Sequence, residues 1–365
     1  MTTRATAAAD KFREKFAKTF GEGTIIRASE RSPYEVIPTG SLTLDHALGV
    51  GGWVRGRLVE IWGDNAVGKT TLSLLSLAEA QRAYPDLEAG FIDMEQTFDR
   101  DHAERLGVDV ERLFLVTPPS AEDVADSLKS MLTSELFSII VVDSIGAMIP
   151  EKEKEKAADE ATVAMQAKIV TRMVKIAATE AAACGTVVIF LNQVRANVGG
   201  YGAATTTPGG FALKHVTTHK VKLKRTGTTP YTVRRSGEAQ QVGHEVAAVV
   251  ERNKVAPPRR TATLNIFHTS SPEYGPVGID KADEAVVIGE RIDAIEKGGG
   301  GWYTVRFTGE RIRGREELVK SLREQPEVVE RIRAQAIAAV AHEVVLEDAT
   351  DHDPGDVDTT DEDEP

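Results

Sequence analysis

Four short apolar runs, separated by stretches of helical character, constrain the fold of this chain more than any other feature. The runs are RLVEIWG, AGFIDME, FSIIVVDS and TVVIFLNQ, and the stretches between them span residues 68–84, 120–136 and 161–183. Strands that alternate with helices pair in parallel, and helices cover both faces of the resulting sheet. The sequence therefore predicts an α/β core with a mainly parallel sheet over residues 34–272.

The N-terminal segment, residues 1–33, contains a predicted amphipathic helix over residues 7–20. Phe12, Phe16 and Phe20 recur at every fourth position, so they share one face of that helix, with basic side chains around the rest. This apolar face packs either on its own domain or on a neighbouring molecule, as an N-terminal polymerisation arm would. The sequence leaves both interpretations open.

The pattern changes again toward the C-terminus. Residues 273–342 combine strand-like and helical stretches around a run of glycines, which indicates a small α+β domain. Residues 343–365 follow with eleven acidic residues and no Lys or Arg. This segment has too few apolar residues to fold, so we expect a disordered tail that carries most of the net charge of −12. Such a tail either solvates the protein or competes with a polyanion for a basic surface.

Composition excludes several classes of protein. The single cysteine, Cys184, rules out an internal disulfide framework and a multi-cysteine zinc module. Its place before an apolar run predicts a small buried side chain. The N-terminus has no apolar signal segment, and no apolar run reaches the length that spans a bilayer. We therefore expect a soluble, cytoplasmic protein.

The stretch GDNAVGKTT, directly after the first apolar run, carries the clearest chemistry. It matches the pattern G-x-x-x-x-G-K-[ST], in which backbone N–H groups and the start of the following helix bind phosphate oxygens. Lys69 would bridge the β- and γ-phosphates of a nucleotide, and Thr70 would bind magnesium. The residues expected to contact the nucleotide here are Gly63, Asp64, Asn65, Ala66, Val67, Gly68, Lys69, Thr70 and Thr71.

Two carboxylates follow the neighbouring apolar runs. Asp143, after the run FSIIVV, can hold the magnesium ion and its bound water. Glu95, after the run AGFID, can orient and deprotonate the water that attacks the γ-phosphate. A glutamate at a strand end can instead cap a helix or lie in solvent, and the local pattern does not exclude that interpretation.

Several motifs in a fixed order make the chain resemble the RecA family of recombinases over about residues 8–340. They are TGSLTLDHALGVGGWVRGRLVEIWG, GDNAVGKTTL, FIDMEQTFD, IIVVDSIGAMIP, IFLNQVR, GGFALK, ERNKVAPP and GWYTVRFTGERIRGR. The resemblance implies a DNA-dependent ATPase that binds ATP and magnesium between the protomers of a helical filament on single-stranded DNA. It would catalyse homologous pairing and strand exchange with double-stranded DNA. Single-strand-binding and loader proteins would be further partners.

The resemblance also assigns roles to residues outside the phosphate loop. Gln193 matches the residue that senses the γ-phosphate and couples it to a DNA-binding loop. Arg252 and Lys254 match two basic residues that reach the neighbour's ATP across the filament interface, where the family usually has two lysines.

Three further residues match the family's adenine contacts. Asp99 matches the acidic contact directly. His102 and His268 stand where tyrosines are usual, which leaves the selectivity for adenine open.

Two loops and one helix form the implied DNA-binding surface. The first loop spans about residues 156–165, and the helix after it carries a stripe of basic residues at i, i+4 and i+7, which can contact phosphates or simply face solvent. The second loop follows the run TVVIFLNQ and is rich in glycine and threonine, with one aromatic residue that can stack on bases. We expect this second loop to be mobile. The residues expected to contact DNA are Val163, Lys168, Thr171, Arg172, Lys175, Arg195, Asn197, Val198, Gly199, Tyr201, Gly209 and Gly210.

Other functions compete with the recombinase. A ring-forming helicase shares the same kind of nucleotide-binding core. A related branch-migration protein normally carries a four-cysteine zinc module, which one cysteine cannot build. A non-catalytic, ATP-gated scaffold would not need Lys69, Glu95 and Asp143 together, because it has no use for a hydrolytic base.

Overall fold

The computed structural model describes residues 2–20, 25, 34–148, 150, 160–193, 195–196, 205–206, 213, 215–227, 231–235 and 238–350. By its internal contacts the chain forms two units, Met1–Glu35 and Val36–Pro365. The first unit contains α1 (Thr2–Phe20), in which the rings of Phe12 and Phe16 lie 5.8 Å apart. The predicted amphipathic helix is therefore present, and it begins several residues earlier than expected.

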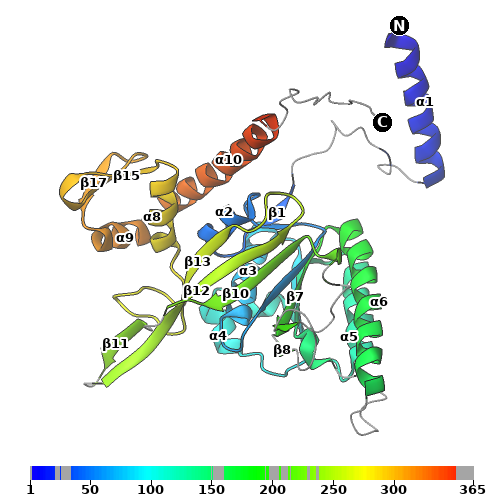
Figure 1. Ribbon diagram of the computed structural model, residues 1–365, viewed down its shortest axis with the longest axis horizontal. Coiled ribbons are helices and arrows are strands. Elements are labelled where there is room, and N and C mark those ends of the chain that lie inside the picture. Colours follow the sequence, from blue (N-terminus) through cyan, green and yellow to red (C-terminus); the bar gives the residue numbers. More distant parts are fainter. Residues whose placement is uncertain are drawn as a thin grey trace, which may run out of the picture. The chain divides into compact units, whose positions relative to one another are not determined.

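A ten-stranded sheet organises the second unit (Figure 1). Its strands, in spatial order, are β14 (Gly278–Ile279), β13 (Thr261–Phe267), β12 (Glu238–Asn253), β10 (His219–Arg225), β3 (Leu58–Gly63), β7 (Val187–Gln193), β6 (Phe137–Asp143), β4 (Glu88–Asp93) and β5 (Leu113–Val116), with β11 (Tyr231–Arg235) paired to β12. The six strands from β10 to β5 are parallel. The remaining four pair antiparallel, which confirms the predicted α/β fold with a mainly parallel sheet.

Helices cover both faces of the parallel strands, because these strands are apolar on both sides. Along β6, Ile139 and Val141 join the apolar cluster under α3 (Lys69–Ala83), whereas Ile140 and Val142 join the cluster under the other helices. Those helices are α5 (Ala121–Thr133) and α6 (Glu160–Cys184), which lie side by side in Figure 1. Cys184, expected to be buried, is only half-buried, because it ends α6.

Shorter elements complete this part of the chain. They are β1 (Val36–Ile37), α2 (Leu42–Leu48), β2 (Trp53–Val54), α4 (Arg100–Arg105), the 3-10 turns Val110–Arg112 and Ile145–Ala147, β8 (Arg195–Ala196) and β9 (Thr205–Thr206). β8 pairs antiparallel with β9. The segment expected to be a mobile loop therefore contains a short ladder, to which two β-branched threonines contribute.

The C-terminal elements enclose an apolar cluster of their own, to which Leu42 of α2 also belongs. They are α8 (Lys281–Arg291), β15 (Ile295–Lys297), the 3-10 turn Gly299–Gly301, β16 (Trp302–Val305), β17 (Glu310–Arg313), α9 (Arg315–Arg323) and α10 (Pro326–Thr350). Because α10 runs to Thr350, the boundary expected at residue 343 lies inside a helix. Alanine, leucine and glutamate favour helix, so the local sequence allows α10 to enter the acidic segment.

A buried carboxylate joins the C-terminal elements to the core. Oε1 of Glu284 in α8 accepts hydrogen bonds from Oγ of Ser41 at 2.6 Å and Oγ1 of Thr43 at 2.7 Å, and Oε2 accepts from the backbone N–H of Leu42 at 2.6 Å. Burial raises the pKa of Glu284 to about 7, although these three donors oppose the shift. Burial also raises the pKa of nearby Asp45 to about 7. The junction therefore contains two carboxyl groups that titrate near neutral pH.

We expect Glu284→Gln to flatten the pH dependence of the free energy of unfolding. Folding raises the pKa of Glu284 from its ordinary value of 4.5, so the stabilisation is complete below that value and is lost as the pH rises through about 7. Denaturant unfolding measures this loss, on the order of a few kcal/mol between about pH 5 and pH 8. The variant should lose less stability than the wild type over this range, with Asp45 still contributing its own share.

Glu273→Gln is the matched control, because Glu273 is exposed. It should leave the pH dependence of unfolding unchanged. Equal pH dependence in the wild type and in Glu284→Gln would show that Glu284 is ionised in the folded protein throughout this range.

Candidate active site

The phosphate loop joins β3 to α3, and two close backbone approaches fix its shape. A Cβ atom at Gly63 would lie 2.3 Å from the carbonyl oxygen of Leu223, and one at Gly68 would lie 2.4 Å from Cδ1 of Ile266. Gly68 also has a left-handed backbone, with φ of 101°. The close backbone oxygen at Gly63 and the left-handed backbone at Gly68 therefore favour glycine at both positions.

Lys69 begins α3 and its side chain folds back over the loop. Its Nζ donates hydrogen bonds to the carbonyl oxygens of Gly63 at 3.1 Å and Asp64 at 2.7 Å. Burial lowers the pKa of Lys69, and the negative charges of Asp143, Glu95 and Asp64 oppose that shift. A lysine in this place, at a helix N-terminus, can exchange carbonyl oxygens for phosphate oxygens.

Thr70, the next residue of α3, meets Asp143 at the end of β6. Oγ1 of Thr70 donates to Oδ2 of Asp143 at 2.9 Å. Burial raises the pKa of Asp143 to about 6, and the hydrogen bond from Thr70 opposes the shift. A hydroxyl and a carboxylate beside a phosphate loop are the hard oxygen ligands that Mg²⁺ prefers. The structure thus brings together the two residues predicted to hold magnesium.

Glu95 lies just beyond β4, where two neighbouring residues orient its carboxylate. Its Oε1 accepts hydrogen bonds from Nε2 of Gln193 at 2.7 Å and from Oγ of Ser144 at 2.5 Å. Gln193 is the last residue of β7, and Ser144 follows β6. The residue predicted to be the base and the residue predicted to sense the γ-phosphate are therefore in direct contact.

These groups fit ATP with magnesium, by the shape of the loop and by the types of donor. When bound, the magnesium complex of ATP supplies the phosphate bond to be cleaved and neutralises part of its charge. The loop N–H groups and Lys69 would bind phosphate oxygens, while Thr70 and Asp143 would hold the metal. Glu95, fixed by Gln193, would orient a water molecule and accept its proton.

The residues predicted to contact adenine lie together near α4. Oδ1 of Asp99 accepts from the backbone N–H of His102 at 2.9 Å and so caps the start of α4. Burial lowers the pKa of His102, and positive charges on Arg105 and His268 add to the shift. Nε2 of His268 lies 3.0 Å from the carbonyl oxygen of Gln241. The two histidines are thus close enough to influence each other.

His244 is a neighbour of the phosphate loop that the sequence analysis missed. It lies opposite Ile266 in the ladder of β12 and β13, so both side chains point to the face of the sheet where Ile266 approaches Gly68. Burial lowers the pKa of His244, and the positive charge of Arg225 adds to the shift. Its position in the alternating stretch QVGHEV was the available signal, because a core residue is expected there.

Arg252 and Lys254 lie near the amino-terminal ends of the parallel strands, whereas the phosphate loop lies at their carboxyl ends. Arg252 pairs with Lys220 at the start of β10, which runs parallel to β3, whereas the loop follows the end of β3. Nζ of Lys254 donates to the carbonyl oxygen of His215 at 2.7 Å. Burial lowers the pKa of Lys254, and positive charges on Arg252 and Arg57 add to the shift. These cations therefore do not contact the phosphate loop of their own chain.

One face of α6 carries the predicted basic stripe. Lys168, Arg172 and Lys175 are exposed and line a shallow surface together with Thr171. Thr171 itself donates to the carbonyl oxygen of Ala167 at 2.7 Å.

Most residues of the two predicted loops lie outside the described residues. Val163 belongs to α6, because this helix begins at Glu160, inside the expected first loop. Arg195 belongs to β8 and pairs with Thr206. The other loop residues predicted to contact DNA lie outside the described residues: Asn197, Val198, Gly199, Tyr201, Gly209 and Gly210.

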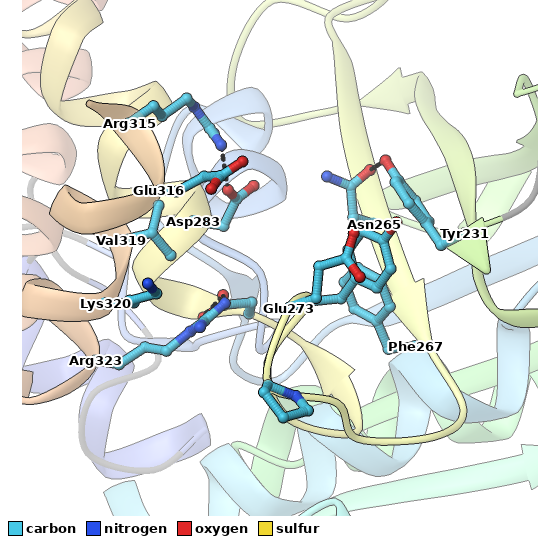
Figure 2. Close-up of a pocket in the computed structure, with 13 residues that line it drawn as sticks. Tyr231, Asn265, Phe267, Glu273, Asp283, Arg315, Glu316, Val319, Lys320 and Arg323 are labelled. Carbon is cyan, nitrogen blue, oxygen red and sulfur yellow. Dashed lines mark hydrogen bonds and ion pairs between the residues drawn. The ribbon is translucent and has the colours of Figure 1, made fainter. Parts of the chain in front are cut away.

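A cleft of about 570 Å³ lies between β13 and α9, and its chemistry differs from that of the phosphate loop (Figure 2). Arg315 pairs with Asp283 at 2.5 Å, and Arg323 pairs with Asp280 at 2.6 Å. Because both cations of these pairs already have acidic partners, the phosphate loop remains the better candidate for an anionic nucleotide.

A phosphate loop after a buried strand, with a metal-binding carboxylate and a strand-end glutamate, defines a phosphate-loop ATPase. The RecA N-terminal domain family matches residues 7–271. The chain is 39% identical over 339 residues to Protein RecA of Thermus thermophilus, covering 90% of this chain and 93% of that protein. It is 35% identical over 347 residues to Protein RecA of Macrococcus caseolyticus, covering 94% and 93%. The chain therefore belongs to the RecA family, whose members are DNA-dependent ATPases of recombination and repair.

Glu95→Gln should separate binding from hydrolysis. The amide keeps the shape of the side chain but cannot accept a proton, so turnover should fall by about 10²- to 10⁴-fold. ATP affinity, measured with a fluorescent analogue, should stay near the wild-type value. Glu104→Gln, at an exposed position in α4, is the control and should hydrolyse normally. Normal hydrolysis by Glu95→Gln would assign the base to another carboxylate.

Proposed function

We propose that this protein polymerises on single-stranded DNA and binds each ATP between two protomers, one supplying the phosphate loop and the next supplying Arg252 and Lys254. These cations and the phosphate loop lie at opposite ends of the parallel strands, and this placement supports an ATP site shared between protomers. A cation at the end of the strands away from the phosphate loop cannot stabilise charge on the nucleotide bound by its own chain, but it can do so on the nucleotide of an adjacent copy.

The contact between Gln193 and Glu95 carries the proposal of DNA-dependent hydrolysis. Gln193 ends β7, and the predicted second DNA loop begins directly after it. A hydrogen bond of 2.7 Å ties this strand end to the proposed base. A change in the loop on DNA can therefore alter the orientation of Glu95, and loss of the γ-phosphate can alter the loop.

Exposed apolar residues at the edge of the sheet support self-assembly. β5 is the last strand of the sheet, and Phe114 and Leu115 on it are 53% and 47% exposed. Leu136, which precedes β6, is 55% exposed. An apolar edge of this kind needs a cover in solution. We propose that the apolar face of α1 from a neighbouring copy, with Phe12 and Phe16, covers it.

We further propose DNA contacts at the basic stripe of α6 and at the second loop, including Tyr201. A cytoplasmic location, and single-strand-binding and loader proteins as partners, are proposals that rest on family membership alone. Each helix among the described residues is too short or too polar to cross a bilayer.

Electron microscopy with single-stranded DNA and a slowly hydrolysed ATP analogue tests the assembly. We expect open helical filaments, with strand exchange when homologous duplex DNA and ATP are added. Phe114→Ser with Leu115→Ser should shorten the filaments and leave ATP affinity unchanged, because both side chains are exposed in the single chain.

Val287→Ser is the control for that variant, since Val287 is 46% exposed on α8, away from β5. It should give filaments of normal length. Closed rings in place of open filaments would contradict the proposal and favour the ring-forming helicase.

A further inference from the structure

A chain of two hydrogen bonds and one ion pair leads inward from Gln193 to the centre of the sheet. The backbone N–H of Gln193 donates to Oδ1 of Asn192 at 3.0 Å, and Nδ2 of Asn192 donates to Oε1 of Glu60 at 3.0 Å. Oε2 of Glu60 pairs with Nζ of Lys220 at 3.0 Å, although the Glu60 side chain is fully buried. The predicted γ-phosphate sensor is thus linked to an ion pair between β3 and β10.

The same ion pair continues toward Arg252. Nζ of Lys220 lies 4.9 Å from the ring centre of Trp62, and Nε1 of Trp62 donates to Oε2 of Glu251 at 2.9 Å. In the ladder, Lys220 pairs with Arg252 whereas Val221 pairs with Val250, so Glu251 is the extra residue of a bulge in β12. A bulge changes the direction of the side chains beside it.

Stability alone does not explain a charged pair in this place. Apolar residues of similar volume are often neutral or stabilising when they replace a buried ion pair. Hydrogen bonds and charges in a low dielectric do, however, fix geometry more strictly than apolar contacts. The chain of contacts begins at Gln193, which contacts the proposed catalytic base Glu95, and ends at the bulge next to Arg252.

We propose that Glu60 and Lys220 are positioning residues that couple the nucleotide bound by one protomer to the cation it presents to its neighbour. In this account Glu60 holds Asn192, and so the backbone of Gln193, while Lys220 and Trp62 set the bulge that directs Arg252. The inference rests on the proposed sharing of each ATP between protomers. The inference adds a path of contacts within one protomer, from Gln193 to Arg252, that couples two successive ATP sites of the filament.

The double variant Glu60→Gln/Lys220→Met tests the coupling, because it removes both charges and leaves neither unpaired in the interior. We expect the melting temperature and the KM for ATP to stay near wild type. The kcat of DNA-dependent hydrolysis should fall by about three- to thirtyfold, the range for residues that modulate coupling between sites. A residue that only stabilised the fold would change the melting temperature and not the kcat.

Combination with Arg252→Gln shows whether the effect passes through Arg252. If it does, adding the double variant to Arg252→Gln should slow hydrolysis by less than about twofold more, because coupled residues are not additive. Lys222→Met is the matched control. Nζ of Lys222 lies 4.5 Å from the same Trp62 ring, but the ion pair of Glu60 is with Lys220. This control should keep its kcat within about twofold of wild type.

Three outcomes would overturn the proposal. They are a wild-type kcat in Glu60→Gln/Lys220→Met, an equal loss of kcat in the wild-type and Arg252→Gln backgrounds, and an equal loss in Lys222→Met. Should the double variant fail to fold, Trp62→Phe provides the test, since it keeps an aromatic side chain and removes the hydrogen bond to Glu251, and a wild-type kcat in this variant would overturn the proposal. Wild-type hydrolysis by Arg252→Gln alone would instead show that the ATP site is not shared. That result would contradict the proposed function, not the coupling alone.

Discussion

The carboxyl ends of β3, β6, β7 and β4 meet at one edge of a parallel sheet, and every other feature of the site depends on this constraint. The ends bring Thr70 to Asp143 and Gln193 to Glu95 through hydrogen bonds of 2.9 and 2.7 Å. Because successive parallel strands need helical crossovers, the functional residues lie far apart in sequence and close together in space. The fold thus assembles a metal-binding pair and a base beside one phosphate loop.

The same sheet keeps charged groups where burial is costly. Burial raises the pKa of Asp143 to about 6 and lowers the pKa of Lys69, so burial disfavours the charged form of both groups. Shifted pKa values of this kind are concentrated at functional sites. Close contact with a metal ion and with phosphate would replace the water that burial removes from Asp143 and Lys69. The electrostatics therefore favour a bound, highly charged ligand at this edge.

Much of this arrangement could be predicted from the sequence. Periodicity located the four central strands and three helices to within a few residues, because each is a long apolar run with clear boundaries. The phosphate loop and the two strand-end carboxylates followed from motif spacing. The sequence did not reveal Glu60, since one acidic residue inside LVEIWG looks like the polar position of a strand. Nor did it reveal His244 beneath the loop, because only the pairing of β12 with β13 places it there.

In the shared site that we propose, Glu95 lies on one side of each ATP and Arg252 with Lys254 on the other, contributed by different protomers. Mixing two inactive proteins, Glu95→Ala and Arg252→Ala/Lys254→Ala, on single-stranded DNA tests this most directly. In a random one-to-one filament, one of four interface types joins two intact faces, so hydrolysis should recover to about a quarter of the wild-type rate. Joint filaments that are no more active than the separate proteins would show that each protomer hydrolyses ATP without its neighbour.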